Sequence, residues 1–176
     1  MRCTQLQFVG VFFGTILFGI ASDAFGRKPV SIFALSLGFL STFATGFVPS
    51  EDALFVARFF VGLSLGGTMV AVFTFMMEML LPQQRMVMRG VFNWGIARLG
   101  LALICLIGKE WRMSAILGSL PAIPALLLII FVFPESPTWL HSKKLIHEMI
   151  EAEKTIARRA NIQYWPTQHR KIVKGK

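Results

Sequence analysis

Charged side chains within or beside long apolar runs are the residues of this chain that could do chemistry. Hydrophobic residues make up 55% of its 176 residues and charged residues only 15%, yet Asp23, Arg27 and Lys28 directly follow one apolar run. Arg58 and Arg98 lie within two others. A carboxylate at such a place needs a cation or the N–H groups of a helix N-terminus. An arginine at mid-membrane depth costs at least ~2.5–3.5 kcal/mol unless it faces a cavity or an acid, so the chemistry predicted is charge pairing and ion recognition.

Groups for covalent or metal chemistry do not assemble in this sequence. There is no paired nucleophile and base and no phosphate-binding loop, so the sequence predicts neither an enzyme nor a nucleotide-driven pump. Cys3 and Cys105 lie far apart in different segments, which gives neither a metal-site spacing nor a disulfide framework. We interpret both cysteines as packing residues and expect no cofactor and no metal.

Long apolar runs must position the charged residues, and they occupy residues 5–22, 29–48, 53–77, 88–108 and 113–133. Each run is about long enough to cross the hydrocarbon core as a helix and too long for a barrel strand. Because the apolar residues fall in separated runs, neither a signal peptide nor a single anchor explains them. The sequence therefore predicts an all-α membrane protein with five transmembrane helices, the last one bent at Pro121 and Pro124.

The distribution of basic residues predicts the orientation and argues against nucleic acid as a partner. Residues 141–176 carry nine basic and three acidic residues, whereas residues 1–140 carry nine and six. Such a tail beside a membrane helix favours the anionic cytoplasmic leaflet. Apolar residues at helical spacing from 141 to 160 predict an amphipathic helix on the inner face. We therefore expect a cytoplasmic amphipathic helix and basic tail over 141–176, in a plasma-membrane protein.

Motifs in a fixed order carry a family resemblance. They are Gly19…Asp23…Gly26-Arg27-Lys28, Arg58…Gly62, Glu78…Pro82…Arg85, Trp111-Arg112 and Pro134-Glu135-Ser136-Pro137-x-Trp139-Leu140. Over residues 5–160 the chain resembles the amino-terminal half of a major facilitator transporter, and most closely the organic cation, organic anion and carnitine transporters. Sugar porters share the first and last motifs. The Met77-to-Pro82 run before Arg85 and the Trp-Arg pair favour the organic-ion family.

The resemblance implies a partial major facilitator fold, with spans equivalent to the second to sixth helices. The first helix and the carboxy-terminal half would be missing, and Thr138 stands where the family usually has Arg. The substrate path of such transporters lies between two halves of six helices each, so this chain alone could not enclose one. The implied function is transport of small organic ions by alternating access. The implied partners are the lipid bilayer, the substrate, and the missing half or another transporter chain.

Two other functions stay open. One is a sugar-porter-like carrier. The other is a truncated membrane protein that does not transport and acts as a partner of a full-length transporter.

By the same resemblance, a charge network at the inner face holds the two transporter halves together in one state and releases them in the other. Its residues here would be Gly19, Asp23, Gly26, Arg27, Lys28, Glu78, Arg85 and Glu135. The first group could instead be a capped turn whose charges set the membrane orientation. Glu78 and Arg85 could equally be a local pair, and Glu135 is placed to stabilise the N-terminus of a helix that starts at Pro137.

Arg58 and Arg98 are the candidates for the substrate cavity. Arg58 lies near the outer end of its run, where it could also extend to water, but its place before Gly62 matches the family motif and suggests the cavity side. Arg98 lies near mid-depth and could contact an anionic substrate group or pair with an acid on a missing helix. Phenylalanines could line a cavity for organic cations, although each is as easily explained by packing; the candidates are Phe12, Phe13, Phe59, Phe73 and Phe92.

Overall fold

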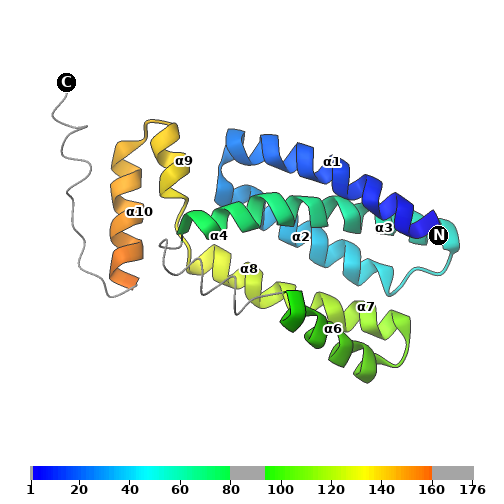
Figure 1. Cartoon of the computed structure of the whole chain (residues 1–176). Coiled ribbons are helices and arrows are strands. Elements are labelled where there is room, and N and C mark those ends of the chain that lie inside the picture. The colour runs from blue at the N-terminus through cyan, green and yellow to red at the C-terminus, as the bar shows by residue number, and fades with distance from the viewer. Residues whose placement is uncertain (1, 80–93, 160–176) are drawn as a thin grey trace.

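The computed structural model describes residues 2–79 and 94–159, and every regular element in these residues is a helix (Figure 1). The helices are α1 (Arg2–Phe25), α2 (Arg27–Thr45), α3 (Glu51–Gly67), η1 (Thr68–Val72), α4 (Phe73–Met79), α6 (Trp94–Gly108), α7 (Trp111–Ser119), α8 (Ala122–Phe131), α9 (Pro137–Ser142) and α10 (Ile146–Arg159). The predicted all-α class is confirmed.

Helices long and apolar enough to cross a membrane dominate the described residues. Four such spans occur there, Thr4–Phe25, Arg27–Thr45, Glu51–Met79 and Trp111–Phe131, with Gly95–Gly108 as a shorter apolar helix. The third span comprises α3, η1 and α4 in one continuous helix, with a π-helical segment at η1. The predicted run 88–108 begins outside the described residues, which is why only its second part is seen.

The last span breaks where its prolines predict a bend. Helix α7 ends at Ser119, and α8 begins at Ala122 directly after Pro121. A proline inside a helix removes a hydrogen bond and its ring clashes with the preceding turn. Pro124 lies in the first turn of α8, where the missing N–H costs little. The span therefore consists of two short helices joined at Pro121.

Helices α1 and α3 cross closely because four glycines face each other across the contact. A methyl group added to Gly10, Gly14, Gly62 or Gly66 would overlap the backbone of the opposite helix. Small residues at such a crossing let two membrane helices pack backbone to backbone. This contact fixes α1 against the α3–α4 helix, and α2 packs against both (Figure 1).

Helices α9 and α10 lie at one end of the bundle, beside the ends of α1 and α4 (Figure 1). Met149 and Ala152 of α10 are buried against Leu140 of α9. Ile156 packs against a second cluster that includes Phe75 and Ile129. The apolar side of this amphipathic helix is thus covered by the protein's own helices.

Candidate functional site

The turn between α1 and α2 has the backbone geometry that its glycine predicts. Gly26 has a φ of 114°, which side-chain-bearing residues rarely adopt. A Cβ atom there would also lie 3.0 Å from the carboxylate of Glu135. The backbone conformation therefore favours glycine at this position, and a Cβ atom would also force the Glu135 carboxylate to shift.

Glu135 caps α2 from the far side of the sequence. Its Oε1 accepts hydrogen bonds from the backbone N–H groups of Arg27 at 3.0 Å, Lys28 at 2.9 Å and Ser136 at 3.0 Å. The first N–H groups of a helix have no partner within it, and a negative charge is favoured there by the helix dipole. The expected contact with the helix beginning at Pro137 is only part of what Glu135 does. Its other partner is the N-terminus of α2.

Arg27 joins three helices through its guanidinium group. Nη2 lies 3.0 Å from Asp23 of α1 and 3.5 Å from Glu78 of α4, and Nη1 donates to Ser22 at 3.1 Å. The side chains of Arg27 and Glu78 are 18% and 16% exposed, whereas that of Asp23 is 71% exposed. Because water screens an exposed pair, the pair of Arg27 with Glu78 should contribute more to stability than the pair with Asp23. The Glu78 pair links α2 to α4.

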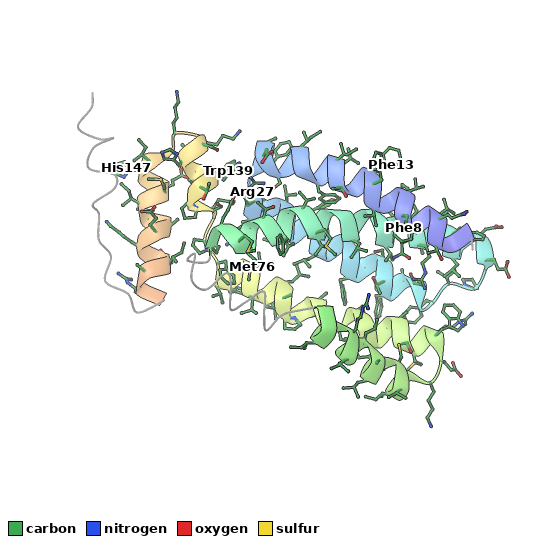
Figure 2. All side chains as sticks on the ribbon, in the orientation of Figure 1. Phe8, Phe13, Arg27, Met76, Trp139 and His147 are labelled. Atoms are coloured by element: carbon green, nitrogen blue, oxygen red, sulfur yellow. The ribbon has the colours of Figure 1, made fainter. Side chains whose placement is uncertain are left out.

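Helix α9 completes the cluster with two residues that sequence reasoning did not select. Ser136, fully buried, donates a hydrogen bond to the second carboxylate oxygen of Glu78 and also accepts from the Trp139 backbone N–H at 3.3 Å. The Trp139 indole N–H donates to the Asp23 carbonyl at 3.0 Å, and Figure 2 shows Trp139 close to Arg27 at this end of the bundle. The Ser-Pro-x-Trp sequence was the available signal for both. We call Asp23, Arg27, Glu78, Glu135 and Ser136 the polar cluster.

Beyond the backbone N–H that Lys28 donates to Glu135, the other residues assigned to the inner network lie apart from these contacts or outside the described residues. Lys28 donates from Nζ to the Ile130 carbonyl of α8 at 3.1 Å. A Cβ on Gly19 would meet only the Val70 side chain, at an ordinary 3.7 Å. Arg85 lies outside the described residues, and so does any pair that it forms with Glu78.

Arg58 lines a pocket between α2, α3, α6 and α7. The cavity measures about 350 Å³, within the range of small-molecule sites. Its lining residues are Thr42, Thr45, Arg58, Val61, Leu101, Cys105, Trp111, Ser114, Ala115 and Gly118. The residues come from the C-terminal halves of α2 and α6, the middle of α3 and most of the length of α7. The pocket therefore lies toward the end of the bundle opposite the polar cluster.

Arg98 lies on α6 with an exposed side chain and is not among the residues that line this pocket. Of the candidate phenylalanines, Phe12 and Phe13 are exposed on α1 and pack edge to face, with ring centroids 5.8 Å apart. Phe73 is exposed on α4 and Phe59 is half-buried on α3. Phe92 lies outside the described residues.

Comparison with known proteins gives one family match and several relatives. The family described as "Sugar (and other) transporter" matches residues 1–176. An uncharacterised protein of Caenorhabditis elegans is 39% identical over 96% of this chain and 33% of its own length. A solute carrier family 22 member 15-like protein of Xenopus laevis is 34% identical over 80% of the chain and 29% of its own length. A niacin transporter of Acinetobacter baylyi is 33% identical over 90% of the chain and 37% of its own length. The chain thus spans about a third of the length of these relatives.

Proposed function

From the premise that this chain belongs to the sugar (and other) transporter family of the major facilitator superfamily, we propose that it forms part of a carrier that moves small organic ions across a membrane. The organic-ion class is supported by the similarity to solute carrier family 22 and by a relative named as a niacin transporter. Sugar transport is the second candidate, because the matched family description names sugars first. Neither organic-ion transport nor sugar transport involves an enzymatic step.

The polar cluster is the observation that carries the mechanism. Alternating access needs contacts that form in one state and break in the other. The half-buried pair of Arg27 and Glu78 joins α2 to α4, and Ser136 joins the same carboxylate to the segment leading into α9. We assign to this cluster, together with Gly19, Gly26, Lys28 and Arg85, the role of closing the inner end.

Two features of the cluster support contact with a further part of the carrier. The Asp23 carboxylate is mostly exposed, so it can pair with a cation from another helix while it remains beside Arg27. The Nε atom of Arg27 is buried and has no hydrogen-bond partner within the described residues. The partner proposed is the carboxy-terminal half of the transporter or a second transporter chain. With the polar cluster at the inner end, α9 and α10 face the cytoplasm. We place the protein in the plasma membrane.

Uptake by cells that express the full-length protein tests the proposal. The probes are radiolabelled tetraethylammonium, nicotinate and glucose, and the control is Arg112→Gln, which alters an exposed arginine far from the cluster. We expect saturable uptake of at least one organic ion, with a loss of about tenfold or more in Arg27→Ala and little change in Arg112→Gln. Uptake of glucose alone would establish the sugar-porter alternative. Uptake of no probe, with altered activity of a co-expressed carrier, would favour a non-transporting partner.

A further inference from the structure

The Arg58 pocket combines one positive charge with apolar walls. Residues from four helices line it, and most of them are apolar or small. Among the described lining residues Arg58 alone is charged, and its side chain is half-buried. In the described part of the chain no carboxylate pairs with it. A guanidinium group in such surroundings favours a negatively charged partner.

The polar groups of the lining narrow the kind of partner. The Thr45 hydroxyl already donates to the Ser41 carbonyl, and the Ser114 hydroxyl to the Glu110 carbonyl. The guanidinium group is the charged donor of the described lining, beside the Thr42 hydroxyl and the Trp111 indole N–H, and its fork matches the two oxygens of a carboxylate. Val61, Leu101 and Trp111 supply a surface for an apolar or aromatic body.

The depth of Arg58 also favours an amphipathic ligand. Arg58 is the eighth residue of α3, which begins at Glu51. At a rise of about 1.5 Å per residue it lies roughly 10 Å along the helix from that end. A ligand reaching it from the nearer membrane surface must place its charged group inside the hydrocarbon layer. An apolar body around a single charge suits this position better than a strongly hydrated ion.

We propose that the Arg58 pocket binds monocarboxylates with an apolar or aromatic body. The inference rests on the proposed function for its biological setting and deepens it, since it names one class of organic ion and the arginine that selects it. The ligand can be an organic acid from solution or a free fatty acid from the bilayer, because both present the same carboxylate and apolar body.

Equilibrium binding to the purified full-length protein in phosphatidylcholine nanodiscs tests this inference. The probe is radiolabelled 2-naphthoate, and 2-naphthamide is the neutral control. We expect saturable binding of the acid and affinity at least about tenfold lower for the amide, because the charged partner strengthens the hydrogen bonds to the guanidinium. Arg58→Gln should lower the affinity for the acid by about tenfold or more, and Arg58→Lys by less.

A matched pair of glycine substitutions tests the cavity itself. Gly118 lines the pocket, and a Cβ atom there meets no atom within 4 Å. Gly95 has the same free space but does not line the pocket. Gly118→Phe should therefore abolish binding by filling the cavity, while Gly95→Phe should leave it unchanged. The elution volume and melting temperature of each variant identify any that fails to fold. If one does, the affinity of Arg58→Lys for the acid and the affinity of the parent protein for the amide still test the proposal.

The source of the ligand follows from a second measurement. Native mass spectrometry of protein purified from cells would detect a fatty acid that naphthoate displaces and that Arg58→Gln does not retain. If no fatty acid is retained but naphthoate binding depends on Arg58, the ligand comes from solution. The proposal is overturned if naphthoate and naphthamide bind alike, or if Arg58→Gln and Gly118→Phe both bind naphthoate as tightly as the parent protein.

These outcomes separate the pocket from the proposed function. Organic-ion uptake with binding that does not depend on Arg58 would contradict the pocket alone. Arg58-dependent binding without uptake of any organic ion would contradict the transport proposal alone.

Discussion

Two arginines at opposite ends of the bundle differ in how the protein uses their charge. Arg27 contacts Asp23, Glu78 and Ser22, and its backbone N–H is capped by Glu135. Arg58 lies beside an apolar cavity, and no acid within the described residues pairs with it. The charges of the polar cluster therefore pair with one another and link helices. The pocket keeps a charge available, which is the condition for recognising a ligand.

The largest difference between the two regions should appear on removing Glu135. Glu135→Ala leaves two N–H groups of α2 without their acceptor and should destabilise the protein by about 3 kcal/mol, given ~1–3 kcal/mol for each unsatisfied buried group. Glu135→Gln keeps one acceptor oxygen and should cost less. Arg58→Ala should change the stability by under about 1 kcal/mol, because the described residues show no ion pair or hydrogen bond to this side chain. Thermal unfolding of the purified protein in one detergent measures all three, and equal losses for Glu135→Ala and Arg58→Ala would contradict the comparison.

Breaking the pair of Arg27 and Glu78 should have the next largest effect. Arg27→Gln alone leaves a half-buried carboxylate without its cation and should cost about 2 kcal/mol. In the double variant with Glu78→Gln part of that loss should be recovered, giving a coupling energy of about 1 kcal/mol or more. A double-mutant cycle of unfolding free energies measures it. Strict additivity would show that the two side chains do not interact in the folded protein.

The backbone at Gly26 should contribute a smaller but clear effect. Gly26→Ala forces a side-chain-bearing residue into positive φ and brings Cβ to 3.0 Å from the Glu135 carboxylate. Such backbone strain costs about 1–3 kcal/mol. Gly118→Ala, in open space within α7, is the matched control and should be neutral or slightly stabilising because alanine favours helix. Equal melting temperatures for the two variants would argue against a strained turn.

The smallest effect on stability is expected at Asp23. Its pair with Arg27 is exposed and spans one helical turn, so Asp23→Asn should cost only about 0.3–0.5 kcal/mol. The Asp23→Asn variant should nevertheless take up the organic ion more slowly, since the proposed role of Asp23 is contact with a further part of the carrier. Parallel measurements of melting temperature and uptake test this separation. A variant with unchanged uptake would remove Asp23 from the proposed network.

Sequence patterns were sufficient for the local part of this structure. Hydrophobic runs predict the helices because a membrane span must satisfy its own backbone, and the proline at 121 predicts the break in the last span. The turn at Gly26 and the pairing of Asp23 with Arg27 also depend on neighbours in the sequence. Of the residues assigned to the inner network, the structure brings Asp23, Gly26, Arg27, Glu78 and Glu135 together.

The parts that sequence could not predict depend on contacts between distant segments. Glu135 caps a helix that begins 108 positions earlier, and nothing in its local sequence distinguishes that helix from the one beginning at Pro137. The bonds of Ser136 to Glu78 and Trp139 to Asp23 are of the same kind. The pocket beside Arg58 arises where four helices meet, so it has no signature in any single run.

The central claim, that the polar cluster opens and closes during transport, is tested most directly by the accessibility of Ser22. This side chain is fully buried and accepts a hydrogen bond from Arg27, so it is shielded while the cluster is intact. The measurement is the rate at which an aqueous thiol reagent modifies Ser22→Cys in a background without other reactive cysteines, with and without a transported organic ion. We predict a substrate-dependent change of about fivefold or more, and a faster rate in the variant that also carries Glu78→Gln. The same slow rate under all conditions, in a protein that still transports, would contradict the account.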